Sequence, residues 1–238
     1  MTSTIPNQRT VVYPESDGNP MADNTKQFRW IVTIKENLEL LFADQADVFV
    51  AGDLLWYPVE GDNKIRQAPD TLVVFGRSKG DRGSYRQWEE DNIPPQVVFE
   101  ILSPGNRLAE MIRKFKFYEQ YGVQEYYVYN PDSFELTGWV QHEGDLSAID
   151  EMNGWISPQL QIRFVIEEGT ELEIYRPDGR KFLTTLELEE RAQEAETKAQ
   201  EAETKAQEAE TKAQEAETKA QAAEQLLTRY HDRFGDLE

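Results

Sequence analysis

Two carboxylates in the middle of the chain have the types and spacing that metal-assisted hydrolysis requires. Asp70 begins one apolar run, and Glu100 interrupts the next, VVFEIL, at residues 97–102. A carboxylate in a buried strand costs several kcal/mol unless it is paired, binds a metal or opens onto a cleft. Neighbouring strands lie about 4.8 Å apart, so two carboxylates at matched depth could share one ion. The sequence therefore predicts a Mg²⁺ (or Mn²⁺) site on Asp70 and Glu100.

A lysine that orients the attacking water and steadies the developing phosphate charge would complete such a site. The helical segment that follows Glu100 offers Arg113, Lys114 and Lys116. Glu110 and Lys114 are four residues apart and therefore share one helix face. That face is offset from the apolar stripe that we expect this helix to bury, which comprises Leu108, Met111, Ile112, Phe115 and Tyr118.

These residues belong to a strand–turn–helix–strand unit, residues 94–131, in which Gly122 ends the helix and a β-rich run follows at 126–129. Before this unit, residues 27–42 have helical periodicity, with Asn24 or Thr25 as the expected cap. The apolar stripe expected on that helix comprises Phe28, Ile31, Ile34, Leu38 and Leu41.

β-rich runs flank these helical segments. Residues 47–59 and 66–76 are expected to form a hairpin, and residues 134–186 an antiparallel extension of the sheet, with 145–154 as turns. The fold class expected is α/β, a mixed sheet flanked by helices.

The polar segment 76–95 is the most basic stretch of the chain. Basic residues interleaved with aromatic ones are typical of contacts with nucleic acid. We predict that this segment grips DNA phosphates, the alternative being a solvated loop that contacts nothing. The predicted phosphate-binding residues are Arg77, Lys79, Arg82 and Arg86.

Composition narrows the class of protein. The net charge is −20, which disfavours non-specific affinity for nucleic acid, so DNA binding has to rest on a local basic patch. Cysteine is absent, which excludes disulfides and thiolate metal sites. No stretch approaches the roughly 18 apolar residues of a membrane span. We therefore expect a soluble, cytoplasmic protein that does not enter a membrane.

The C-terminal segment, residues 187–238, is a heptad repeat. The sequence AQEAETK occurs four times without change between Ala192 and Lys219. Alanine fills both seam positions, which predicts a helix that forms readily and only a weak coiled coil, because alanine buries little area. A homodimer or homo-oligomer is the expected partner arrangement, and a solvated single helix is the alternative.

The middle of the chain resembles the Uma-two family, restriction-endonuclease-like proteins of the PD-(D/E)xK nuclease superfamily. The resemblance covers roughly residues 20–185. Four patterns carry it: Pro69-Asp70, Val98-Phe99-Glu100-Ile101-Leu102-Ser103-Pro104, Glu110-x-x-x-Lys114-x-x-x-Tyr118, and Tyr121-Gly122-Val123-x-Glu125-Tyr126-Tyr127. The chain departs from the family in carrying Glu110 in place of Asp, and it lacks the His that many members have in the helix at 27–42.

The resemblance implies a site and a reaction. It implies Asp70 and Glu100 as metal ligands, the Ile101 carbonyl as a third, and Lys114 as the catalytic lysine. We expect Glu110 to orient Lys114 and not to bind the metal. The implied function is a Mg²⁺-dependent endonuclease that hydrolyses DNA. The alternative is an inactive nuclease-like scaffold that binds proteins through its coiled-coil tail.

Three of the predicted site residues could instead have purely structural roles. Asp70 could cap a strand, Glu100 could form a buried ion pair, and Lys114 could be a surface lysine. The expected domains are a flexible lead-in at 1–22, a nuclease-like domain at 23–186 and a heptad-repeat helix at 187–238.

Overall fold

The computed structural model describes residues 11–18 and 20–235, which divide into two units between Thr184 and Thr185. The predicted lead-in, residues 1–22, lies partly outside the described residues. The helices are α1 (Thr25–Leu41), η1 (a 3₁₀ turn, Gln87–Glu89), α2 (Leu108–Gln120) and α3 (Thr185–Phe234). The strands are β1 (Val48–Ala51), β2 (Trp56–Tyr57), β3 (Thr71–Phe75), β4 (Tyr85–Arg86), β5 (Val97–Ile101), β6 (Glu125–Asn130), β7 (Glu135–His142), β8 (Asp145–Ala148), β9 (Arg163–Val165) and β10 (Glu173–Tyr175).

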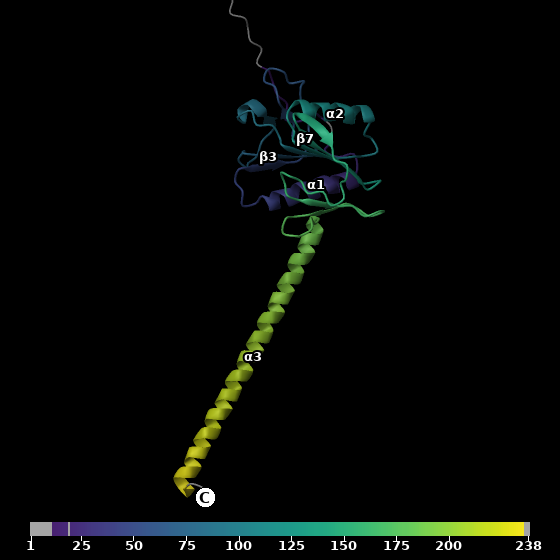
Figure 1. Cartoon of the computed structure of the whole chain (residues 1–238). Helices are drawn as coiled ribbons and strands as arrows, with labels where there is room; N and C mark the ends of the chain where they lie inside the picture. Colours follow the sequence, from purple (N-terminus) through teal and green to yellow (C-terminus); the bar gives the residue numbers. More distant parts are fainter. Residues whose placement is uncertain (1–10, 19, 236–238) are drawn as a thin grey trace, which may run out of the picture. The chain divides into compact units, whose positions relative to one another are not determined.

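A six-stranded mixed sheet of order β1-β3-β5-β6-β7-β8 forms the centre of the first unit. β5 and β6 are parallel, because α2 connects them as a crossover, and the other neighbouring pairs are antiparallel. Helices α1 and α2 lie on opposite faces of the sheet (Figure 1). This is the α/β, restriction-endonuclease-like architecture expected from the sequence.

Strand β5 is buried along its whole length, and its side chains alternate between two cores. Val97, Phe99 and Ile101 pack on the α1 side, whereas Val98 packs on the α2 side with Tyr118. Glu100 has the same parity as Val98 and therefore faces α2. A charged side chain is thus held inside the second core.

Helix α1 begins at the predicted cap, because the Asn24 side chain accepts a hydrogen bond from the Gln27 backbone N–H at 2.9 Å. The predicted stripe was wrong at one position: Phe28 is 49% exposed, whereas Trp30 is buried. Trp30 lies on the other flank of the stripe, so the buried face of α1 is turned away from Phe28.

Helix α2 shows a similar rotation with more consequence. Leu108 is 78% exposed and Ile112 is 47% exposed, so the predicted stripe was wrong at both positions. Tyr118 is fully buried and the Lys114 side chain is only 11% exposed. The buried face of α2 is therefore turned towards Lys114.

Two expectations about the sheet need correction. Only β7 and β8 extend it, whereas β9 and β10 form a separate two-stranded sheet, because β10 pairs with β9 and not with the main sheet. β8 also lies in a segment expected to be turns. In the expected hairpin, β1 pairs antiparallel with β3, while β2 leaves it to pair with β4.

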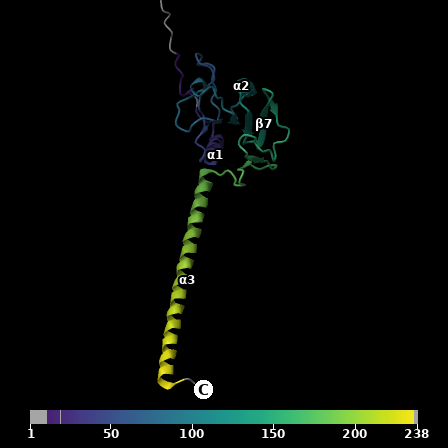
Figure 2. The same cartoon turned by 60° about the vertical axis from the view of Figure 1, so that its left-hand side comes forward.

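The second unit consists of the 50-residue helix α3, which is continuous from Thr185 to Phe234 (Figure 2). At 1.5 Å per residue its length is about 75 Å. The alanines of the repeat are exposed along its length. None of the helices in the described part of the chain is long and apolar enough to cross a membrane.

Candidate active site

The strand register places the two predicted carboxylates next to each other. β3 and β5 are antiparallel, with Thr71 opposite Phe99. One further step in this register sets Asp70 opposite Glu100. Residues that lie directly opposite each other on antiparallel strands share a face of the sheet, and their Cβ atoms are about 5 Å apart. Asp70 and Glu100 are 8% and 2% exposed. Both therefore lie buried under α2, with Asp70 just before the start of β3.

Glu100 is held by two side chains of α2. Its Oε2 accepts a hydrogen bond from Lys114 Nζ at 2.7 Å, and its Oε1 accepts one from the Tyr118 hydroxyl. Burial and the Glu100 charge hold the pKa of Tyr118 well above its usual value, so the phenol stays protonated and donates. Lys114 and Tyr118 are four residues apart, so a single helix face fixes both carboxylate oxygens.

Lys114 remains charged although it is buried. Burial opposes its charge, but the carboxylates of Glu100 and Asp70 outweigh that effect and raise the pKa of Lys114 above its usual value. A lysine held in the protonated form donates hydrogen bonds and stabilises negative charge, and it does not accept a proton.

Asp70 is the less satisfied of the two carboxylates. Its Oδ2 accepts the Ile101 backbone N–H at 2.6 Å. The other oxygen, Oδ1, accepts no hydrogen bond from any residue within 11–18 and 20–235. Burial and the nearby Glu100 charge raise the pKa of Asp70 well above its usual value. A cation beside Asp70 would offset that repulsion.

The two remaining predicted site residues have different surroundings. The Ile101 carbonyl accepts a hydrogen bond from Gln27 Nε2 of α1 at 2.8 Å, which uses one of its two lone pairs. Glu110 forms no hydrogen bond with Lys114, although its charge contributes to the raised pKa of that lysine. Its side chain lines a hollow beside Lys114.

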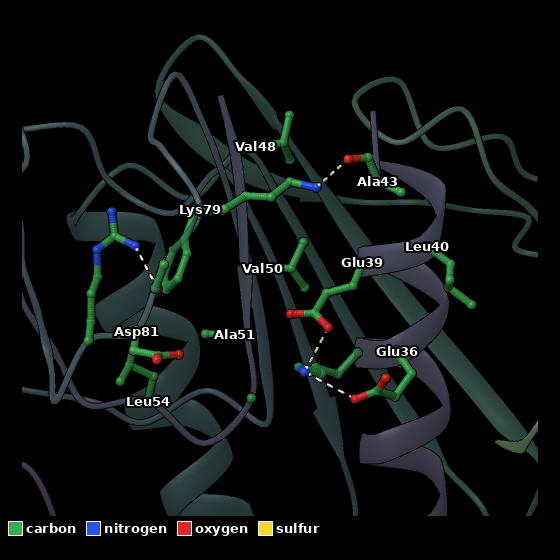
Figure 3. A pocket seen from close by; sticks show the side chains of 15 residues that line it. Glu36, Glu39, Leu40, Ala43, Val48, Val50, Ala51, Leu54, Lys79 and Asp81 are labelled. Carbon is green, nitrogen blue, oxygen red and sulfur yellow. Dashed lines mark hydrogen bonds and ion pairs between the residues drawn. The ribbon is translucent and has the colours of Figure 1, made fainter. Parts of the chain in front are cut away.

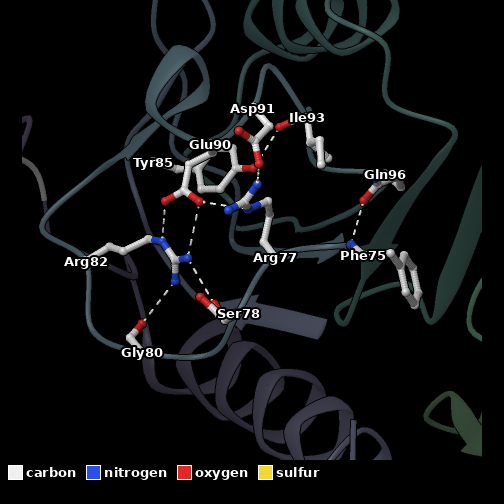
Figure 4. Close-up of polar contacts among 10 residues, drawn as sticks. All are labelled: Phe75, Arg77, Ser78, Gly80, Arg82, Tyr85, Glu90, Asp91, Ile93 and Gln96. Carbon is white, nitrogen blue, oxygen red and sulfur yellow. Dashed lines mark hydrogen bonds and ion pairs between the residues drawn. The ribbon is translucent and has the colours of Figure 1, made fainter. Parts of the chain in front are cut away.

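The basic segment predicted to grip DNA forms contacts within the protein (Figure 4). Arg82 forms an ion pair and hydrogen bonds with Glu90, and Arg77 pairs with Glu90 and Asp91. Outside that view, Arg86 pairs with Glu89. Lys79 donates to the carbonyls of Phe42 and Ala43 at the end of α1. DNA binding through these cations would have to break those contacts, so we give them no part in the site.

Another hollow, about 610 Å³ in volume, lies between α1, edge strand β1 and residues 79–82 (Figure 3). Asp70, Glu100 and Lys114 do not line it. Its charged groups form local pairs, such as Lys35 with Glu36 and Glu39. We therefore place the candidate site at the carboxylates and not in this hollow.

Asp53 is a charged neighbour of the site that sequence reasoning missed. It has a positive φ of 49°, and its N–H donates to the Pro69 carbonyl, one residue before Asp70. Burial, followed by the charge of Asp17, raises the pKa of Asp53, and Lys114 and Glu100 also act on it. Only the folded chain shows that Asp53 lies beside the carboxylates.

The donor set suits a hard divalent cation. Carboxylate and carbonyl oxygens are the ligands of Mg²⁺, which usually keeps several waters and takes one or two carboxylates from the protein. Within the described residues, no group of three or more His, Cys, Asp or Glu side chains could hold a metal. Two carboxylates, one with an oxygen free of hydrogen bonds, therefore fit Mg²⁺ or Mn²⁺ better than zinc.

A mixed sheet with two carboxylates and a lysine on one face defines a restriction-endonuclease-like protein. The profile of the Uma2 family, described as "Putative restriction endonuclease", matches residues 17–203. The chain therefore belongs to the Uma2 family, as the sequence resemblance indicated. A second profile, described as "Alanine-zipper, major outer membrane lipoprotein", matches residues 184–232.

A solved structure is also similar to this chain. It is described as a putative nuclease belonging to DUF820, from Anabaena variabilis, with 16% sequence identity and a TM-score of 0.43. The match covers 57% of this chain and 72% of that one. The comparison with curated proteins gave no match.

Proposed function

We propose that the protein is a Mg²⁺-dependent endonuclease that hydrolyses phosphodiester bonds of DNA. The observation that carries this proposal is the ion pair between Lys114 and Glu100 at 2.7 Å, on the face of the sheet that Asp70 shares. Membership of a family described as "Putative restriction endonuclease" supports DNA as the substrate.

Asp70, Glu100 and the Ile101 carbonyl would hold the cation. When bound, Mg²⁺ supplies charge stabilisation at the phosphate and a lower pKa for the attacking water. Lys114 stays protonated, donates hydrogen bonds to the water or to the phosphate oxygens, and stabilises charge that develops there. Tyr118 keeps the Glu100 carboxylate oriented by its hydrogen bond, and Glu110 favours the charged form of Lys114.

We expect the full-length protein to nick supercoiled plasmid in Mg²⁺ or Mn²⁺ and to lose this activity in EDTA. Restoring the cation should restore nicking, because the carboxylates remain in place. The measurement is conversion of supercoiled to open-circular plasmid on a gel. A preparation that nicks equally well in EDTA would contradict a metal-dependent mechanism. A preparation that fails to nick in both Mg²⁺ and Mn²⁺ would favour the inactive scaffold.

We further propose that α3 joins copies of this chain into a homodimer or homo-oligomer. In the heptad register of the repeat, Leu188 and Leu227 also fall on seam positions, one at each end of the alanine series. Lys198 and Glu203 occupy flanking positions that pair between chains in parallel coiled coils. The match of residues 184–232 to the alanine-zipper profile supports the same arrangement.

Two lysines placed in the seam should dissociate this oligomer. We expect Ala206→Lys with Ala213→Lys to reduce the molecular mass to that of one chain, because each buries a charge. Thr204→Lys with Thr211→Lys adds the same charge on the outer face and should leave the mass unchanged. Light scattering with size-exclusion chromatography measures the mass. A wild type that is monomeric at all concentrations leaves α3 as a single helix.

A further inference from the structure

A second hollow, about 350 Å³ in volume, opens beside the candidate catalytic lysine. It is formed by the segment before β3, by α2 and by the segment that contains Asp17. Its lining residues are mostly polar: Asp17, Leu55, Arg66, Gln67, Ala68, Glu110, Arg113 and Lys114. Three cations therefore converge on one space, and one of them is Lys114.

Arg66 and Arg113 differ from the other arginines near the site in having no acidic partner among the described residues. Within the described part of the chain, the Arg66 side chain reaches the Tyr57 hydroxyl and the Asn63 carbonyl, at 3.4 Å and 3.5 Å, and both contacts use the same nitrogen. Arg113 makes no ion pair or hydrogen bond through its side chain with any described residue. By contrast, Arg82 is fully engaged by Glu90 and by backbone carbonyls. The two guanidinium groups thus keep most of their donors available.

We propose that Arg66 and Arg113 bind a backbone phosphate of the DNA in this hollow and thereby hold the strand against Lys114. This inference rests on the proposed function and extends it to the residues that position the substrate. A guanidinium group presents donors in a fork that matches two phosphate oxygens, whereas Lys114 is already paired with Glu100. Phosphate contacts of this kind set register and carry no base specificity.

Asp17 limits the affinity of the same hollow. The segment that leads to it is fastened at Tyr13, whose ring lies 5.2 Å from that of Tyr57, and at Pro14, whose carbonyl accepts the Tyr57 hydroxyl at 2.8 Å. These contacts place the Asp17 carboxylate at the hollow that we assign to a phosphate. Bound DNA would have to accommodate or displace that negative charge, so Asp17 should weaken binding.

The test is binding of a short fluorescein-labelled DNA duplex to the full-length protein, measured by anisotropy in EDTA and again in Ca²⁺. We expect Arg66→Ala with Arg113→Ala to weaken binding about tenfold or more. The slope of log affinity against log salt concentration should become shallower by about one for each phosphate that the variant no longer neutralises. Lys64→Ala with Lys116→Ala is the matched control. It removes the same charge from the same two segments, but neither lysine lines the hollow, so binding should fall by less than about threefold.

Asp17→Asn should change the DNA affinity in the opposite direction, because it removes negative charge from the hollow without truncating a side chain. We expect it to tighten binding about threefold at low salt. Equal losses from the arginine pair and the lysine pair, or no loss from either, would overturn the assignment while leaving wild-type binding and nicking intact. A wild type that binds no duplex in either condition would instead overturn the proposed function itself.

Discussion

Lys114→Ala should lower Mg²⁺-dependent plasmid nicking by at least about a hundredfold, because it removes the cation nearest to the two carboxylates. Lys116→Ala, two residues further along α2 and exposed, should nick as the wild type does. The rate of open-circle formation at saturating Mg²⁺ measures both variants. Nicking by Lys114→Ala at the wild-type rate would remove this lysine from the mechanism.

The same substitution should also destabilise the fold. Glu100 is 2% exposed, and without Lys114 its charge is left buried with only the Tyr118 hydroxyl as partner. Breaking a buried ion pair on one side costs about 3–5 kcal/mol. Urea unfolding, followed by circular dichroism, measures this loss and shows whether the variant is folded in the nicking assay. Loss of activity in Lys114→Ala alone therefore does not separate chemistry from structure.

Asp70→Asn should separate a loss of catalysis from a loss of folding, because it is expected to abolish nicking while raising the free energy of unfolding. Asparagine keeps an oxygen for the Ile101 N–H but removes a buried charge that repels Glu100. Removing an unfavourable charge interaction of this kind typically stabilises a protein by about 0.5–2 kcal/mol. In EDTA, the urea midpoint should therefore rise relative to the wild type, whereas nicking in Mg²⁺ should fall by about a hundredfold or more.

The opposite outcome would have a clear meaning. A less stable Asp70→Asn that still nicks plasmid would show that Asp70 acts as a cap for the Ile101 N–H and not as a metal ligand. Asp62→Asn is a suitable control, because Asp62 precedes β3 in the same connecting segment but does not line the hollow beside Lys114. We expect that control to change neither stability nor nicking by a measurable amount.

The core of the site could be predicted because it depends on local pattern. A carboxylate in an apolar run of β character is unusual enough to identify Glu100, and the antiparallel pairing of β3 with β5 then brings Asp70 opposite to it. The cap at Asn24 and the heptad repeat are also local signals, which need only neighbouring residues for their interpretation. The family membership that these motifs indicated is shown by the profile match.

Other expectations, such as which face of each helix is buried, depend on tertiary contacts that the spacing of apolar residues does not reveal. Phe28, Leu108 and Ile112 fit an apolar stripe but are exposed, because the rotation of a helix about its axis is set by what it packs against. In α2, the rotation that exposes Leu108 and Ile112 is the one that carries Lys114 and Tyr118 to Glu100. The same is true of the basic segment, residues 76–95. The sequence does not show which acidic residues its arginines pair with, because those pairs depend on the folded position of the segment.

The sequence by itself determined the chemical groups: two carboxylates in β-rich runs, a lysine on the following helix and an alanine heptad tail. The tertiary structure decided which cation meets which acid. It paired Arg77 and Arg82 with Glu90 and Lys114 with Glu100, and it left Arg66 and Arg113 beside the hollow with no acidic partner among residues 11–18 and 20–235. The physical reason is that a charge finds its partner through space, across segments whose relative positions are set only when the apolar faces of the sheet and helices pack together.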